Sequence, residues 1–505
     1  MNSSRVFQPI DEGQFDLEAI VAALSARFAV VPGAKRSVRR ARLDTFDRRL
    51  YAAGLTLEHQ TVASGERLVL SHLDGSATAA VPVTKLRWPA LADILPASPV
   101  KDAVVPVAGI RALMVTSNEK RRTRGMELSN QDGKTVVRLE LDESASAVNS
   151  AADSRLAVNT LRGYDKQARQ AVRLLTDIGL QPVANGGDRG SDFAPPTVGI
   201  DRAAPASELL ANALNTHLVT MRDNLPGLLD NVDTEFLHDF RVSVRRTRAT
   251  LKLGRPCLPE TMRSRWEPAF KGLCDLTTPV RDLDVYELDL PTMGGWLVAA
   301  DPTDLEPFAA HLRSRRTVKR RALVRGLTSA KFRTLMTDWE EELARMGSIP
   351  RHEVQRHLSA GQLADRGISR TYKRVVRGGA AISPDSPAED LHRLRKSCKE
   401  LRYALEVCAP VVAKGPRKRA VAELKGLQDV LGRFQDSEVQ RRALHGFAEE
   451  MIAGGSPTAA VLAMGELIGH LDAEQDRARH EFAGAFTHFV RPSSRRVMQK
   501  LGGEA

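Results

Sequence analysis

LHDFRVSVRRTRATL, residues 237–251, and LHRLRKSCKELRYAL, residues 391–405, are two copies of one motif in a chain of 505 residues. The copies lie 154 residues apart, and their register continues without a gap to the Lys-Gly-Leu segments that begin at Lys271 and Lys425. This period is much longer than the roughly 20–50 residues of a solenoid repeat. We therefore predict a duplicated half-domain with a pseudo-twofold axis.

Both copies have the periodicity of an α-helix with one apolar face. Residues three and four positions apart share a face. The apolar line consists of Leu237, Phe240, Val244, Thr247 and Leu251 in the first copy and of Leu391, Leu394, Cys398, Leu401 and Leu405 in the second. The line beside it is basic. It consists of His238, Arg241, Arg245, Arg248 and Lys252 in the first copy and of His392, Arg395, Lys399 and Arg402, followed by Glu406, in the second.

A line of cations needs a partner. Like charges one turn apart destabilise an isolated helix by roughly a few tenths of a kcal/mol per pair. A neutral imidazole can donate a hydrogen bond to a phosphate oxygen, and an imidazolium adds charge below about pH 6.5. Two plainer interpretations stay open: the arginines pair with acids on neighbouring helices, and the histidines are satisfied core residues. Because the line occurs twice in matched positions, we favour an anionic ligand.

The composition narrows the class of ligand. The net charge of +12 predicts an anionic partner. Aromatic residues make up only 5% of the chain, which is poor for stacking single-stranded bases, since each stacked base is worth about 1–3 kcal/mol. The four cysteines form no Cys-x-x-Cys pair, which fits a reducing compartment and no zinc site. With no apolar run of about 18 residues and no signal peptide, we expect a cytoplasmic protein without membrane contact or cofactor.

The chain reads as a multidomain α+β protein. Residues 1–183 mix a helix at 15–28 with strand-like stretches, and Asn130-Gln131-Asp132-Gly133 predicts a hairpin turn. Residues 184–204 are rich in proline and glycine and are expected to be a linker. Residues 205–505 read as all-α, with halves at about 205–345 and 355–505 and roughly four helices in each half, broken at prolines such as Pro291.

Residues from about 205 to 500 resemble the CHAD domain. The resemblance rests on the two His-x-x-Arg helices, on the Lys-Gly-Leu segments, on Arg281-Asp282-Leu283-Asp284-Val285 and on the segment from Leu424 to Gly432. It implies a pair of four-helix bundles around a basic pore, binding of inorganic polyphosphate there and a link with polyphosphate granules. The ligand-binding residues that it implies are His238, Arg241, Arg245, Arg248, His392, Arg395, Lys396, Lys399 and Arg402. To these we add Lys252 from the basic line, and Lys271 and Lys425, which open the two Lys-Gly-Leu segments.

Further basic residues are weaker candidates. They are Arg222, Lys373 and Arg374, which precede the two His motifs, and Arg316 and Arg320, which belong to a basic run that could be a solvated face. Arg246 and Arg393 lie outside the two basic lines and are expected to point to solvent. Glu400 and Glu406 depart from the family pattern, so the two halves are expected to bind the ligand unequally.

The N-terminal segment resembles a CYTH domain, the triphosphate-tunnel fold, which implies an antiparallel β tunnel. Three stretches carry this: 43–57, Lys120-Arg121-Arg122-Thr123-Arg124 and the segment that begins at Leu161. Active members carry a Glu-x-Glu-x-Lys strand that holds the metal, and residues 5–10 contain no carboxylate. Glu140 and Asp142 alternate on a predicted strand, but two carboxylates make a weak metal site. We therefore expect a degenerate tunnel and no catalytic residues.

The sequence favours a polyphosphate-binding protein over three alternatives. The first is a metal-dependent triphosphatase or polyphosphatase that acts through the N-terminal tunnel. The second is a nucleic-acid-binding protein, because the same stripes could follow a nucleic-acid backbone. The third is a structural protein whose arginines are all paired internally.

Overall fold

The computed structural model describes residues 4–9, 15–73, 77–144, 154–182, 199–346 and 358–503. The chain divides into two compact units, Met1–Pro195 and Pro196–Ala505. Most of the predicted linker at 184–204 lies outside the described residues, as does most of the predicted boundary between the halves, from about 345 to 355. Among the described helices, none is both long enough and apolar enough to cross a membrane.

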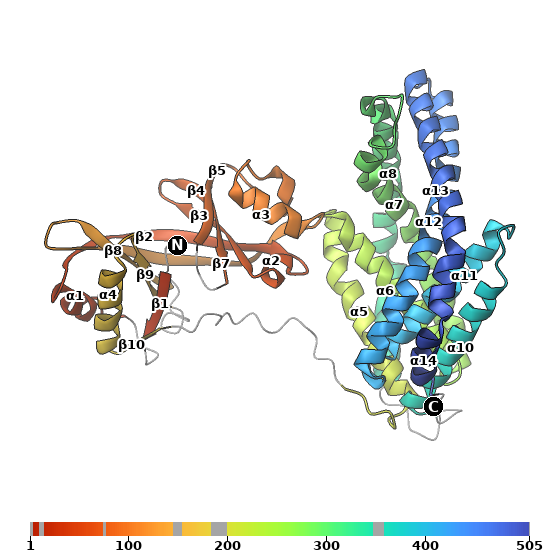
Figure 1. Ribbon diagram of the computed structural model, residues 1–505, viewed down its shortest axis with the longest axis horizontal. Coiled ribbons are helices and arrows are strands. Elements are labelled where there is room, and N and C mark those ends of the chain that lie inside the picture. The colour runs from red at the N-terminus through yellow and green to blue at the C-terminus, as the bar shows by residue number, and fades with distance from the viewer. Residues whose placement is uncertain are drawn as a thin grey trace. The chain divides into compact units, whose positions relative to one another are not determined.

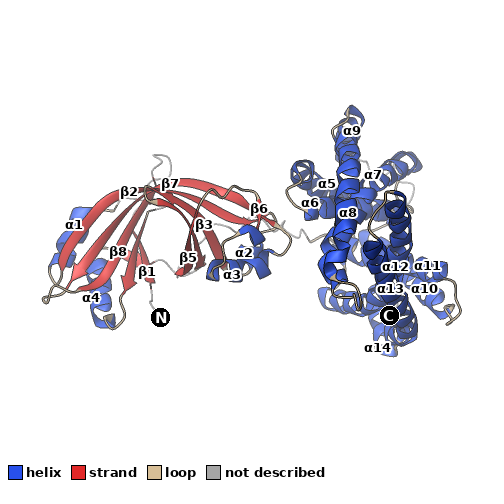
Figure 2. Cartoon of the chain, turned by 90° about the horizontal axis from the view of Figure 1, so that it is seen from above, coloured by secondary structure: helices blue, strands red, loops and turns tan. Residues whose placement is uncertain are grey.

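The N-terminal unit is built on one antiparallel sheet, as predicted. Its order is β10-β1-β9-β8-β7-β2-β3-β4-β5, with β6 paired to β7. Figure 2 shows the sheet curved into an arch with helices near both ends. The strands are β1 Ser4–Pro9, β2 Ala29–Thr45, β3 Leu55–Val62, β4 Gly65–His72, β5 Ala77–Val83, β6 Ala90–Leu91, β7 Ala112–Ser129, β8 Thr135–Ser144, β9 Arg155–Thr160 and β10 Leu180–Pro182. The helices are α1 Leu17–Ser25, α2 Arg49–Ala52, α3 Pro99–Ala108 and α4 Asp165–Asp177, with a 3-10 turn at Ala92–Ile94.

The long strands β2 and β7 form the centre of this sheet. They pair over almost their whole lengths, with irregularities between Pro32 and Lys35 and between Arg42 and Leu43. The predicted hairpin turn joins β7 to β8, and the amide of Gly133 donates to the carbonyl of Asn130 over 3.0 Å. Gly133 has a φ of 73°, a conformation that glycine adopts at no steric cost.

Two apolar clusters anchor the helices to the sheet. One joins α1 and α4 to β7, β8 and β9, with Leu24, Leu175 and Leu139 buried in it. The other joins α2 and α3 to β2, β3 and β4, with Leu50, Val104 and Leu57 buried in it. Between the two clusters, the sheet carries polar and charged side chains.

The C-terminal unit is all-α and duplicated, as predicted. Figure 1 shows that α7 and α8 form one tall hairpin and that α12 and α13 form another. Each half has five α-helices within the described residues, one more than the four expected, and α7 continues through Pro291 instead of breaking there. The helices are α5 Ala206–Asp230, α6 Thr234–Leu253, α7 Glu260–Gly294, α8 Glu306–Leu327, α9 Ala330–Met346, α10 Ala360–Ala380, α11 Ala388–Val407, α12 Lys414–Ala453, α13 Thr458–Val490 and α14 Pro492–Leu501.

The helix starts reproduce the sequence period. The first three helices of the second half begin at Ala360, Ala388 and Lys414, each 154 residues after the starts of α5, α6 and α7. The segments that lead into the two halves pair with each other. The amide of Ala206 donates to the carbonyl of Leu358 over 2.9 Å, and the amide of Ala360 donates to the carbonyl of Ala204 over 2.7 Å. These two bonds exchange under the 154-residue shift, which confirms the predicted pseudo-twofold axis.

Candidate anion-binding site

The two motif helices α6 and α11 are neighbours in the fold. Their apolar lines are buried as predicted, with Phe240, Val244, Leu394 and Leu401 at 2% exposure or less. Asp233 caps α6, because its carboxylate accepts from the amides of Glu235 and Phe236. With the apolar lines buried, the basic lines lie at the edge of the core and not on a fully solvated surface.

Cations from both basic lines meet in one place. Burial, followed by repulsion from Arg395, Arg245 and Arg241, lowers the pKa of Lys399 to about 8, against the attraction of Asp436. Lys399 is the symmetry equivalent of Arg245, and Arg395 is that of Arg241. We call these four residues the axis cluster, because they come in two symmetry-related pairs.

The axis cluster is only partly neutralised. Arg395 forms an ion pair with Asp436 at 3.0 Å. Arg241 instead donates to the hydroxyl of Thr278 over 2.6 Å, and burial, followed by repulsion from Arg245, lowers its pKa. No ion pair to Arg245 is found within the described ranges, and its Nε is buried without a hydrogen-bond partner. Guanidinium groups held in this way have donors left for an anion.

The next turn of each stripe shows how the halves have diverged. Arg248 is exposed and its only nearby partner in the described part of the chain is the Sγ of Cys274, at 3.8 Å. Its equivalent Arg402 donates to Glu406 over 3.0 Å, and to Gln428, the equivalent of Cys274, over 3.5 Å. At this turn the first half therefore keeps the less neutralised cation.

The two histidines differ in the same way. The Nδ1 of His392 lies 2.5 Å from the Oε1 of Gln435, so this ring is tied to α12. The equivalent of Gln435 is Arg281, and it faces His238. Burial and then Arg281 lower the pKa of His238, which is partly buried. The His392 ring therefore also has a structural role.

Several other predicted residues have acidic partners nearby. Lys252 pairs with Glu400, which also accepts from Arg374 over 2.5 Å. Lys271 pairs with Asp275 on its own helix at 2.7 Å. Lys396 and Lys425 are exposed, and no ion pair to either is found in the residues that the structure describes.

The weaker candidates mostly hold helices together. Arg222 pairs with Glu340 on α9. Arg316 donates to the buried carboxylate of Asp284 over 2.5 Å. Arg320 donates to the last-turn carbonyls of Leu228 and Leu229 over 3.0 and 2.7 Å, and so caps α5. Lys373 is exposed and also interacts with other residues.

The off-stripe arginines also differ from each other. Arg393 is exposed, as expected, and pairs with Asp390 on its own helix. The expectation that Arg246 points to solvent is wrong, because it reaches across to the other half and pairs with Glu406 at 3.1 Å. This contact depends on the pseudo-twofold packing, which a helix considered alone does not show.

Several polar side chains of the N-terminal sheet pair with one another. Asp142 accepts from Arg40 over 2.6 Å and from Arg121 over 2.8 Å. Glu58 accepts from Gln60 over 2.7 Å and lies 3.8 Å from Arg40. No group of three or more His, Cys, Asp or Glu in the described residues is placed to hold a metal ion. Because Asp142 pairs with both Arg40 and Arg121, its carboxylate is already balanced by two guanidinium groups.

The helical unit has matches among known proteins. The family model of the CHAD domain matches residues 212–445, so the predicted CHAD domain is confirmed there. The crystal structure of the CHAD domain from the plant Ricinus communis shares 23% identity, with a TM-score of 0.46, covering 63% of this chain and 98% of that one.

Other solved structures are similar to the N-terminal unit. An adenylate cyclase candidate from Bacillus halodurans shares 15% identity with a TM-score of 0.27 and covers 38% of this chain and 98% of its own. An adenylyl cyclase candidate from Hippeastrum, described as having a dominant triphosphatase activity, shares 13% identity with a TM-score of 0.28 and covers 39% of this chain and 98% of its own. Among curated proteins the comparison gives no match.

Proposed function

We propose that the helical unit binds inorganic polyphosphate at the axis cluster and recruits the protein to polyphosphate granules in the cytoplasm. The observation that carries this proposal is the convergence of Arg241, Arg245, Arg395 and Lys399 from two symmetry-related helices. Four cations share this place with two acids, Asp282 and Asp436, so an anion in contact with the cations would relieve their mutual repulsion.

Polyphosphate fits the chemistry of the cluster. It is a thin, flexible polyanion without bases or sugars, so its binding needs spaced cations and hydrogen-bond donors but no aromatic side chains. Arginine offers a planar fork that matches two phosphate oxygens, while lysine acts as a point charge. Partial burial strengthens these contacts, because the local dielectric is lower than that of water. A twofold arrangement of donors would contact a chain from both sides.

The alternatives have less support. A triphosphatase in the N-terminal sheet would need a divalent metal, and Asp142 is already held by Arg40 and Arg121. We therefore propose that this unit is an adaptor or a second anion contact. A nucleic acid would be held by its phosphates only, since the axis cluster contains no aromatic side chain for stacking.

The test is binding of labelled long-chain polyphosphate to the full chain at about 150 mM salt, where the Debye length is about 8 Å. The test variant is Arg245→Ala with Arg395→Ala. Its matched control is Arg366→Ala with Arg496→Ala, which removes the same charge from exposed positions of the same unit. We expect a loss of affinity of about a hundredfold in the test variant, since charge-assisted hydrogen bonds are the strong ones.

Two further readouts, helical content and displacement by tRNA, make the binding test decisive. Circular dichroism must show an unchanged helical signal in both double variants. Transfer RNA should displace polyphosphate from the wild type poorly. Equal losses in the test and control variants, or equal displacement by tRNA, would show that the protein attracts polyanions only through its net charge.

A further inference from the structure

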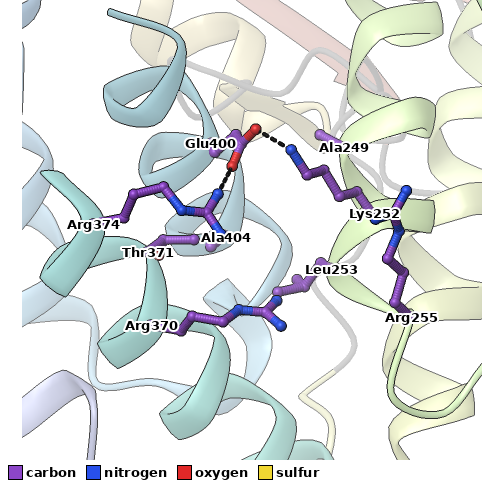
Figure 3. A pocket seen from close by; sticks show the side chains of 9 residues that line it. All are labelled: Ala249, Lys252, Leu253, Arg255, Arg370, Thr371, Arg374, Glu400 and Ala404. Carbon is purple, nitrogen blue, oxygen red and sulfur yellow. Dashed lines mark hydrogen bonds and ion pairs between the residues drawn. The ribbon is translucent and has the colours of Figure 1, made fainter. Parts of the chain in front are cut away.

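A pocket of about 100 Å³ lies where α6, α10 and α11 meet. Figure 3 shows its lining residues. Ala249, Leu253 and Ala404 contribute apolar surface. The charged lining consists of one carboxylate, that of Glu400, and of the four cations Lys252, Arg255, Arg370 and Arg374. The pocket shares no residue with the axis cluster.

The charge of the pocket is unbalanced. Glu400 accepts from both Lys252 and Arg374, so one carboxylate serves two cations. Arg255 pairs with Glu267, which does not line the pocket. Arg370 is exposed, reaches toward Leu253 in Figure 3, and has no ion pair within the described residues. Four cations against one lining carboxylate leave a clear excess of positive charge.

The pocket lies between the two halves, and its symmetry-related position lacks counterparts of its three arginines. The positions equivalent to Arg370 and Arg374 are Thr216 and Thr220, and the position equivalent to Arg255 is Ala409. A charged pocket of this kind is therefore not a by-product of the duplicated fold.

We propose that this pocket binds a single phosphoryl group, with Glu400 as the anion that occupies the cationic positions when no ligand is bound. A volume of about 100 Å³ leaves room for one tetrahedral oxyanion. Arg370, which has no ion pair within the described residues, supplies a planar fork, which suits phosphate oxygens better than a lone ammonium does. The phosphoryl group has two sources: free phosphate, or the end of a polyphosphate chain.

The first experiment titrates inorganic phosphate into the full chain by calorimetry. The variant Arg370→Ala should bind phosphate about tenfold more weakly than the wild type, since one charge-assisted contact is lost. Glu400→Gln should bind it more tightly, because the competing carboxylate is gone. The control Arg496→Ala removes an exposed arginine that does not line the pocket and should bind like the wild type. Equal affinity in Arg370→Ala and the wild type would overturn the proposal.

A second experiment separates the two sources. Linear tripolyphosphate has two end groups, whereas cyclic trimetaphosphate has none. If the pocket takes chain ends, Arg370→Ala should lower the affinity for the linear compound and leave that for the cyclic one unchanged. If only free phosphate is bound, neither affinity should change while phosphate binding falls. The chain-end case rests on the proposed polyphosphate function. The variant Arg245→Ala with Arg395→Ala separates a failure of that function from a failure of the pocket proposal, because it should lose long-chain binding and keep phosphate binding.

Discussion

Arg246 on α6 pairs with Glu406 on α11 at 3.1 Å, and the 154-residue shift converts this contact into the pair of Glu400 with Lys252, which the structure also contains. The two ion pairs are thus symmetry equivalents with their charges exchanged. Two identical copies of the first half would place cations opposite cations at these positions. The two glutamates that depart from the repeat therefore allow the halves to join.

This relationship gives a prediction about stability. Glu406→Lys should destabilise the helical unit by about 1–2 kcal/mol, because an exposed pair worth about 0–1 kcal/mol is replaced by a repulsion. Denaturant unfolding followed by circular dichroism measures this change. Adding Arg246→Glu should recover part of the loss, with Arg402 still lacking its partner. A double variant whose loss equals the sum of the single losses would show that the two residues are not coupled.

A second prediction concerns pH. The pKa of Lys399 is lowered to about 8 by burial and by Arg395 and Arg245. A bound polyanion favours the charged form, so polyphosphate affinity should fall as the pH rises from about 7 to 9, as the free protein loses this proton. Lys399→Arg should flatten that part of the profile, because arginine stays charged. An unchanged slope in this variant would mean that another group causes the pH dependence.

The same group has a consequence for folding. Between about pH 8 and 10 the unfolded chain holds the Lys399 proton more tightly than the folded protein does, so this residue makes stability rise with pH. Lys399→Met should therefore stabilise the protein at pH 7 and lose part of that advantage by pH 10. Denaturant midpoints of the two proteins at both pH values measure the difference. A constant difference would contradict a lowered pKa.

A fourth prediction tests the N-terminal network. Asp142→Asn should destabilise this unit by about 1.5–3 kcal/mol, because charge-assisted hydrogen bonds from Arg40 and the buried Arg121 are weakened. The matched control is Glu140→Gln on the same strand, which changes an exposed residue and should have little effect. Proteolysis of the native protein, which reports unfolding of each unit separately, measures both. Equal effects would show that the network does not stabilise the sheet.

Much of this architecture could be predicted from the sequence because it is local or repeated. The 3.6-residue period placed the core face of α6 and α11, and the 154-residue register placed the axis. The partners of the cations were not predictable, since Asp436 and Glu406 reach them only through helix packing. Strand β2 was hidden for another reason: its central residues are mostly basic and show no apolar alternation.

A fifth prediction concerns two glycines within helices. In α7, a Cβ on Gly272 would meet nothing within 4 Å, so Gly272→Ala should stabilise the unit by about 0.5–1 kcal/mol through the lower helix entropy cost of alanine. In α5, a Cβ on Gly227 would lie 2.5 Å from the ring of Phe236, so Gly227→Ala should destabilise it by about 1–3 kcal/mol through overpacking. Thermal and denaturant unfolding of both variants measure the contrast. Stabilisation by both would mean that the Phe236 ring can move aside, and that α5 and α6 are packed less tightly than their buried faces indicate.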